Sequence, residues 1–247
     1  MARMARLYIP HTAQLVQVRG NNGSAVFFNE ADYAQWQAIV RTIVPVYELD
    51  IHAYALVENA VYLLVSARND KALGQFMQDL GRRYVRYVNS QYQRTGTLWE
   101  GRYRTGYIQD VPYVLHAYVW LDGMSEHSSR AQHLGHYAHS FLREHAQYWQ
   151  LGNTPFERQT RYAQLLEQGI TQNTRKALEH AVQTGWMLGD DALLAQIEEQ
   201  TGRRVRPAAA RCGSGPVLSR PGTSRAEPEW RAARAGQSCP RRRRYRR

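Results

Sequence analysis

Residues 1–125 switch repeatedly between strand-like and helix-like patterns of apolar and polar residues. Residues 12–19 alternate with a two-residue period and predict a strand, and the short β-prone segments 50–57, 60–66 and 103–109 predict three more. Helical spacing predicts three helices, beginning at Asn29, at residue 69 or 70, and at residue 111 or 112. The order β-α-β-β-α-β-α is that of the split βαβ motif. We therefore expect a ferredoxin-like α+β domain, with an antiparallel sheet and helices on one face.

The rest of the chain divides into three segments of different composition. Residues 126–154 are polar and rich in histidine, and we expect a solvated connector. Residues 155–205 have helical spacing, with helix starts at Pro155 and Asp190, and predict a small helical module. Residues 206–247 have few large apolar side chains and much Ala, Gly, Pro, Ser and Arg, so we expect a disordered basic tail.

The net charge of +11 belongs to the tail and not to the body. Residues 201–247 contain 14 arginines and two glutamates, which leaves residues 1–200 at a net charge of −1. Global charge therefore does not make the folded part a nucleic-acid binder. Two interpretations of the tail stay open: it neutralises phosphates, or it has no selected role.

Cysteine and apolar content exclude several classes of protein. The two cysteines, Cys212 and Cys239, both lie in the tail, so the body has neither a disulfide framework nor a cysteine-ligated zinc site. The apolar runs fall far short of the roughly 20 residues that span a bilayer. We expect a cytoplasmic protein that does not contact membranes.

Residues 82–104 combine basic and aromatic side chains more densely than any other segment of the body. Against Glu100 stand six arginines: Arg82, Arg83, Arg86, Arg94, Arg102 and Arg104. Between them lie five aromatic residues: Tyr84, Tyr87, Tyr92, Trp99 and Tyr103. Guanidinium groups bind phosphate, and aromatic faces stack on unpaired bases for roughly 1–3 kcal/mol each. We expect the six arginines, Tyr87 and Trp99 to contact single-stranded or hairpin DNA. The alternative is that Tyr84 and Tyr87 pack under the sheet while the arginines face solvent.

Five blocks of the sequence resemble the single-tyrosine (HUH-type) insertion-sequence transposases, and most closely the REP-associated tyrosine transposases. The blocks are RGNN (19–22), FFNEADY (27–33), GRRYVRYVN (81–89), GTLWEGRY (96–103) and YVWLD (118–122). The resemblance covers about residues 5–125 and continues more weakly through 188–204. It implies a ferredoxin-like domain that cuts single-stranded DNA at hairpin-flanked ends through a 5′-phosphotyrosine. It also implies a divalent metal held by two histidines and a polar side chain.

The resemblance places the catalytic tyrosine at Tyr118 and the polar metal ligand at Asp122. The positions of the two histidines are occupied by Ala60 and Tyr62. Alanine has no donor atom, and a protonated phenol is a poor ligand for a cation. We therefore expect a catalytically degenerate site without a cofactor, in which Mg²⁺ or Mn²⁺ would bind only if the site were active.

Three hypotheses follow from these residues. The first is a transposase-like protein that binds single-stranded or hairpin DNA and has lost strand cleavage. The second is an active tyrosine transposase with unorthodox metal ligands drawn from Asp122, Glu58 and His52, although His52 is better explained as a structural histidine. The third is a non-enzymatic protein-interaction fold. Hairpin binding separates the first two from the third, and a metal-dependent covalent adduct separates the second from the first. The sequence does not fix the oligomeric state, for which the resemblance suggests a homodimer.

Overall fold

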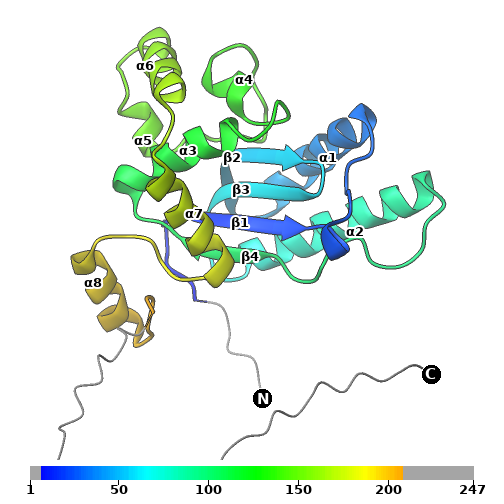
Figure 1. Ribbon diagram of the computed structural model, residues 1–247, viewed down its shortest axis with the longest axis horizontal. Helices are drawn as coiled ribbons and strands as arrows, with labels where there is room; N and C mark the ends of the chain where they lie inside the picture. The colour runs from blue at the N-terminus through cyan, green and yellow to red at the C-terminus, as the bar shows by residue number, and fades with distance from the viewer. Residues whose placement is uncertain (1–6, 208–247) are drawn as a thin grey trace, which may run out of the picture. The chain divides into compact units, whose positions relative to one another are not determined.

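A four-stranded antiparallel sheet lies at the centre of the computed structural model, which describes residues 7–207 (Figure 1). The strand order β2–β3–β1–β4 confirms the predicted ferredoxin-like arrangement. The strands are β1 (Gln14–Arg19), β2 (Leu49–Val57), β3 (Ala60–Ala67) and β4 (Arg104–Tyr107). Short turns of helix lie at η1 (Asn21–Gly23), η2 (Val44–Val46) and η3 (Asp110–Val114).

The hairpin between β2 and β3 has the predicted tight turn at residues 58–59, since Val57 pairs with Ala60. Further along the hairpin the register shifts between Ile51 and Ala53. His52 is therefore the extra residue of a β-bulge, which bends β2 and redirects its side chain.

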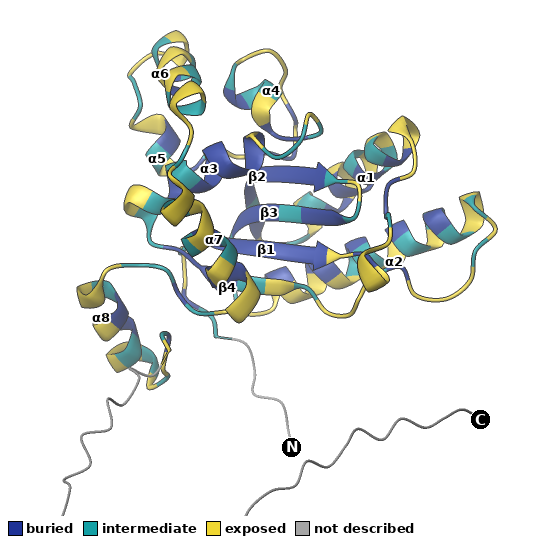
Figure 2. Ribbon diagram, viewed as in Figure 1, coloured by how far each residue is buried: buried dark blue, intermediate teal, exposed yellow. Residues whose placement is uncertain are grey.

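One face of the sheet is covered by α1 (Glu30–Ile43) and α2 (Ala72–Gln91). Asn29 caps α1 as predicted: its side chain accepts a hydrogen bond from the N–H of Asp32, whose carboxylate accepts one in return from the N–H of Asn29. Trp36, Phe76 and Tyr84 are fully buried between these helices and the strands. Figure 2 shows β1, β2 and β3 as largely buried.

The other face is covered as well, which the sequence analysis did not predict. Here α3 (Leu115–Asp122), α6 (Pro155–Gln168) and α7 (Gln172–Thr184) pack on a second apolar cluster that includes Leu15 and Leu64 of the strands. The helical segments 155–168 and 172–184 thus belong to the same core as the sheet. The described residues lie within one compact unit, Met1–Ala208.

The expectation of a solvated histidine-rich connector is wrong for three of its histidines. This segment contains α4 (Arg130–His133) and α5 (Ala146–Trp149), and His133, His139 and His145 are buried. The ring of His133 hydrogen-bonds to Asp122, that of His139 to the hydroxyl of Tyr54, and that of His145 to the N–H of Gln147. Nδ1 of His139 is buried and has no hydrogen-bond partner among the described residues.

The helix α8 (Asp191–Thr201) begins at the predicted cap Asp190 and packs against Tyr107 and Ile9 in a third, smaller cluster. None of the helices in the described part is long and apolar enough to cross a bilayer. The predicted tail lies outside the described residues from residue 208 onward, and both cysteines lie outside with it.

Candidate functional site

The turn after β1 is held against the segment that precedes β4. The N–H of Asn21 donates to the carbonyl of Leu98, and the N–H of Glu100 donates to that of Arg19, each at 2.9 Å. A Cβ at Gly20 would collide with the backbone of the turn itself, so only glycine fits there. Two of the blocks that carry the resemblance therefore form one rigid corner, which fixes Arg19 beside residues 98–104.

The tyrosines of residues 82–104 join α2 to α1. Asp32 is fully buried, and its carboxylate accepts hydrogen bonds from the hydroxyls of Tyr87 (2.9 Å) and Tyr92 (2.7 Å). Tyr84 is also buried and donates to the carbonyl of Val26 (2.8 Å). Tyr84 therefore packs in the core, as the alternative interpretation of residues 82–104 expects. A DNA contact by the half-buried Tyr87 stays a prediction.

Three of the arginines expected to contact DNA lie on the exposed side of α2. Arg83 forms an ion pair with Asp79 (2.9 Å), while Arg82 and Arg86, one helical turn apart, line a groove of about 680 Å³. An exposed ion pair contributes only about 0–1 kcal/mol, so Arg83 can exchange its partner for a phosphate. This surface is accessible to a nucleic acid.

The side chains of Arg94 and Trp99 lie against aromatic rings, unlike the exposed arginines of α2. The guanidinium of Arg94 lies 5.7 Å from the centre of the Phe28 ring. Trp99 is half-buried, with its ring 6.0 Å from that of Tyr84. Its indole N–H has no hydrogen-bond partner among the described residues. Trp99 therefore supports the core as well as lining the groove beside α2.

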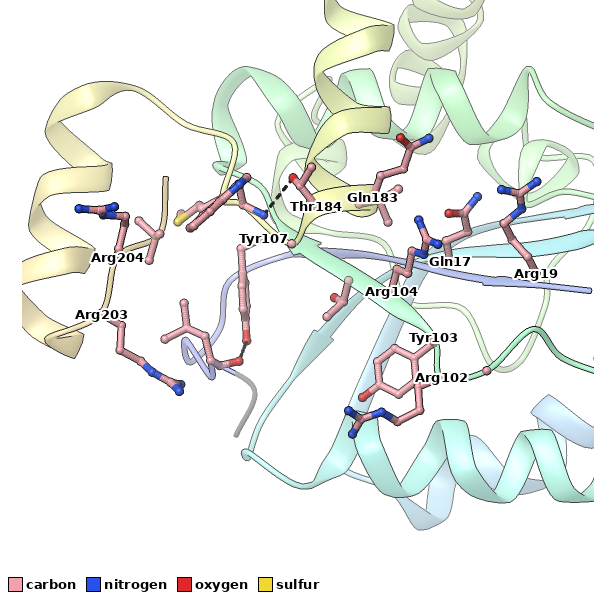
Figure 3. A pocket seen from close by; sticks show the side chains of 18 of the residues that line it. Gln17, Arg19, Arg102, Tyr103, Arg104, Tyr107, Gln183, Thr184, Arg203 and Arg204 are labelled. Atoms are coloured by element: carbon pink, nitrogen blue, oxygen red, sulfur yellow. Dashed lines mark hydrogen bonds between the residues drawn. The ribbon is translucent and has the colours of Figure 1, made fainter. Parts of the chain in front are cut away.

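A second set of arginines surrounds a cavity of about 990 Å³ beside β4 (Figure 3). Its basic side chains come from three separate parts of the chain: Arg19, then Arg102 and Arg104, then Arg203 and Arg204. Glu100 is the only acidic residue among the described residues that line it. Five guanidinium groups around one carboxylate make the cavity electropositive.

The sequence analysis missed Arg19, Arg203, Arg204 and Trp186 as parts of this cavity. A signal for Arg19 exists, because the alternation of β1 places it on the same face as Gln17. No spacing in the sequence links residues 203–204 to β4, since only the packing of α7 and α8 brings them there.

Tyr118, the expected catalytic tyrosine, is completely buried in α3. Its hydroxyl accepts a hydrogen bond from the backbone N–H of His145 (2.9 Å), and its ring centre lies 4.4 Å from that of His133. Burial raises the pKa of Tyr118 well above its ordinary value, so the hydroxyl stays protonated. Attack on a phosphodiester requires access to the substrate and loss of that proton.

Asp122, the last residue of α3, is buried at the centre of a polar network. Its carboxylate accepts hydrogen bonds from the hydroxyls of Ser129 and Tyr162 and from Nδ1–H of His133, each at 2.6 Å. Nε2 of His133 faces another acceptor, the carbonyl of His52 (3.1 Å). Both nitrogens of the ring therefore lie within hydrogen-bond distance of an oxygen acceptor. This network ties α3 to α4 and α6.

The two positions expected to hold metal-binding histidines lie on the other side of α3 from Tyr118. The hydroxyl of Tyr62 accepts a hydrogen bond from Nε2 of Gln17 (2.6 Å), and its ring packs edge-on against Trp120, 5.7 Å between centres. Residues two apart in a helix point about 200° apart. Trp120 therefore faces Tyr62 and its strand neighbour Ala60, while Tyr118 points away from them.

The residues present do not fit the divalent metal that the resemblance implies. Position 60 offers a methyl group, the hydroxyl of Tyr62 is engaged by an amide, and the oxygens of Asp122 accept three hydrogen bonds. In the described part of the chain no three or more His, Cys, Asp or Glu side chains converge as a metal site requires.

His52 and Glu58 do not supply replacement ligands in this arrangement. Nδ1–H of His52 donates to the carbonyl of Arg143 (2.7 Å), and Nε2 accepts from the hydroxyl of Ser66 (2.9 Å). Burial lowers the pKa of His52 to about 4, so the ring is neutral and structural. Glu58 is exposed in the hairpin turn.

Comparison with known proteins relates the chain to transposases. Residues 13–120 match the family described as Transposase IS200 like. Among solved structures, the chain is similar to a REP-associated tyrosine transposase bound to a REP hairpin, with 11% identity over 58% of this chain and 93% of that chain and a TM-score of 0.46. It is also similar to a candidate transposase from Deinococcus radiodurans R1, with 19% identity over 42% and 84% of the two chains and a TM-score of 0.33. No curated protein matches the chain. The predicted resemblance to the insertion-sequence transposases is confirmed.

Proposed function

We propose that this chain, whose residues 13–120 match the IS200-like transposases, binds single-stranded or hairpin DNA and does not cut it. The observation that carries the proposal is the arginine-lined cavity beside β4. The proposed location is the cytoplasm, the partner is DNA, and no resident metal is required.

The concentration of positive charge supports DNA binding. Residues 1–200 carry about as many acidic as basic side chains, yet arginines dominate this one cavity. Arginine forks onto phosphate oxygens, and clustered arginines attract a polyanion from a distance. The cavity and the groove beside α2 share residues 101–103, so the two basic surfaces adjoin each other.

The proposed loss of cleavage rests on the residues around α3. A phosphodiester needs electrostatic stabilisation of the charge that develops during attack, to which a metal ion contributes several kcal/mol. Ala60 and Tyr62 cannot hold that ion, and Tyr118 is buried with its hydroxyl protonated. We infer that the described residues meet neither requirement of the tyrosine mechanism, a bound metal ion and an accessible, deprotonated hydroxyl.

Binding can be tested by fluorescence anisotropy on the full chain, with a DNA hairpin, a scrambled unstructured strand and a duplex. We expect the hairpin and the single strand to bind more tightly than the duplex. Arg102→Ala combined with Arg104→Ala should weaken binding to all sequences, because phosphate contacts carry no sequence information. The salt slope on a single strand should fall by about 0.7 for each phosphate that the variant no longer neutralises.

A matched pair of exposed arginines provides the control. Arg161 and Arg175 form ion pairs within α6 and α7 and line neither the cavity nor the groove. Changing both to alanine removes the same charge and should leave binding unchanged. Equal reductions in affinity from the two double variants would mean that binding follows net charge, and the proposal would fail.

The surface of α2 is tested separately with Arg82→Ala, Arg83→Ala and Arg86→Ala together. We expect weaker binding to every sequence, again measured against the Arg161 and Arg175 control. Unchanged binding would remove α2 from the DNA surface and leave the cavity as the site.

Cleavage is tested by incubating the chain with hairpin DNA and Mg²⁺ or Mn²⁺ and separating the products on a denaturing gel. We expect no covalent adduct. A metal-dependent adduct that disappears in Tyr118→Phe would contradict the proposed loss of cleavage. Asp122, Glu58 and His52 would then be the ligands to examine.

A further inference from the structure

The groove beside α2 is lined mainly by apolar side chains. They come from β1, α1, α2 and the segment before β4, and include Val18, Trp36, Met77, Leu80, Val85 and Trp99. Trp36 has no exposed surface, so it forms the floor, and Met77 and Leu80 are buried beside it. The volume of about 680 Å³ lies within the roughly 300–1,000 Å³ found for pockets that bind small molecules. The groove can therefore hold the apolar part of a small molecule.

Two glycines leave this side of α2 without side chains. Gly74 and Gly81 are about two helical turns apart, and both line the groove. A Cβ added at Gly81 would have Nε1 of Trp99 as its nearest contact, 3.8 Å away, and one added at Gly74 would have the hydroxyl of Tyr103, 3.9 Å away. Glycine inside a helix is less stable than alanine, and neither contact requires it. The two glycines instead provide space beside the helix.

The charged side chains that line the groove are all arginines. Arg82 and Arg86 lie one turn apart on α2, and Arg102 lies in the segment before β4; all three are exposed. No acidic side chain lines the groove within the described part of the chain. Asp79, on the same helix, pairs with Arg83 instead (2.9 Å). An apolar floor below arginines favours a ligand with an apolar body and an acid group.

Two indole N–H groups beside the groove lack acceptors. Nε1 of Trp36 and Nε1 of Trp99 are both buried, and neither has a hydrogen-bond partner among the described residues. A buried donor without an acceptor is unfavourable. Trp99 is only half-buried, so a turn of its ring would bring the N–H to the groove, where an oxygen of the ligand can accept it.

We propose that the groove beside α2 binds a small amphiphilic acid, an aromatic apolar body that carries one carboxylate. The apolar body packs on Trp36, Met77 and Leu80. The carboxylate accepts hydrogen bonds from Arg82 and Arg86. A nucleobase fits less well, because its polar edge would be buried against apolar side chains.

Binding is measured on the full chain, without DNA, with 1-anilinonaphthalene-8-sulfonate, an anionic dye that reports apolar surface. We expect saturation at one dye per chain. The dye is then displaced with 2-naphthoate or with 2-naphthamide, which has the same shape and no charge. The acid should displace it about tenfold more effectively, because hydrogen bonds between ionised groups are the stronger ones. Equal displacement by acid and amide, or no saturable binding, would overturn the proposal.

The position of the site is tested with Gly81→Leu, which places a side chain in the groove and should weaken dye binding about tenfold or more. The control is Gln75→Leu, an exposed position of α2 that does not line the groove, and it should leave binding unchanged. Urea unfolding checks that each variant folds, and Gly74→Leu replaces Gly81→Leu if that variant does not. Equal dye binding by the groove variant and the control would place the dye elsewhere and contradict the site.

The role of the arginines is tested with Arg82→Gln combined with Arg86→Gln. This variant should lose most of the preference for 2-naphthoate over 2-naphthamide. Arg161→Gln combined with Arg175→Gln removes the same charge outside the groove and should retain the preference. A preference that persists in the Arg82 and Arg86 variant would contradict their assignment to the carboxylate.

Competition with DNA rests on the proposed function, because Arg82 and Arg86 are also expected to contact DNA. In the hairpin anisotropy assay, saturating 2-naphthoate should weaken hairpin binding by the unmodified chain about threefold or more and leave that of Gly81→Leu unchanged. An equal effect on both chains, or none on either, would overturn this competition. A chain that binds the dye as expected and no hairpin would end the proposed function and leave the acid site standing.

Discussion

Replacing Asp122 by alanine removes the acceptor at the centre of the buried network. Three donors then lose their partner: the hydroxyls of Ser129 and Tyr162, and Nδ1–H of His133. All four side chains are in the interior, where water does not replace the missing hydrogen bonds. The change therefore separates a structural role of Asp122 from the metal-binding role that the resemblance implies.

The expected loss of stability follows from the kinds of group involved. Each buried donor that is left without an acceptor costs about 1–3 kcal/mol. These costs are not additive, because the three donors share one acceptor. We expect Asp122→Ala to lower the free energy of unfolding by about 4 kcal/mol, a large share of the roughly 5–15 kcal/mol typical of a domain.

Urea unfolding at pH 7, followed by tryptophan fluorescence and circular dichroism, measures this loss. Glu167→Gln, an exposed change on α6, is the control and should cost less than about 0.5 kcal/mol. Asp122→Ala combined with His133→Ala should cost clearly less than the sum of the two single changes, since neither partner is then left buried alone.

Two results would refute the reasoning. A loss below about 1 kcal/mol for Asp122→Ala would show that the carboxylate does not hold the three donors together. A rise in the unfolding midpoint on addition of Mg²⁺, present in the unmodified chain and absent in Asp122→Asn, would show that the carboxylate faces a cation instead.

Three further predictions concern the rest of the fold. Burial lowers the pKa of His52 and of His139 to about 4, so the unfolded chain binds more protons between about pH 4 and 6.5. Urea unfolding should therefore show stability falling as the pH drops through that window, by about 2 kcal/mol at pH 5 for His52 alone, and the fall should be smaller in His52→Gln. Gly106→Ala should cost about 1–3 kcal/mol, because a Cβ there collides with the carbonyl of Ala181 on α7. By contrast Gly81→Ala, whose nearest contact is at 3.8 Å in helix α2, should stabilise the chain by about 0.5–1 kcal/mol in the same assay.

Local patterns predicted most of the first helical layer and the sheet. Asn29 and Asp32 form a cap from residues three apart, and the turn at 58–59 joins two adjacent strands, so both depend on neighbours in sequence. The helices on the second face of the sheet were harder to predict from the sequence. Residues 60–66 are apolar almost without interruption, which is typical of a strand covered on both faces.

The functional side chains depend on partners that are distant in sequence. In the sequence, Tyr87 cannot be distinguished from a residue that stacks on bases. The structure shows that its hydroxyl donates a hydrogen bond to the carboxylate of Asp32, 55 positions earlier. Arg19 and Arg203 line one cavity although more than half of the chain separates them. Composition identified the basic and aromatic residues, whereas tertiary packing decides which of them face a ligand.

A last prediction tests whether the absence of the two histidines is enough to explain the absence of cleavage. It depends on the directions in which the side chains of α3 point. Ala60→His combined with Tyr62→His would place two imidazoles opposite Trp120, because Trp120 packs against Tyr62. Tyr118 and Asp122 point to the other side of the helix, into the buried network. We therefore expect the double variant to form no covalent adduct with hairpin DNA in Mn²⁺, even where calorimetry shows that it binds the ion. An adduct that disappears on adding Tyr118→Phe would mean that α3 rotates to bring Tyr118 over β3, and would contradict this account of the site.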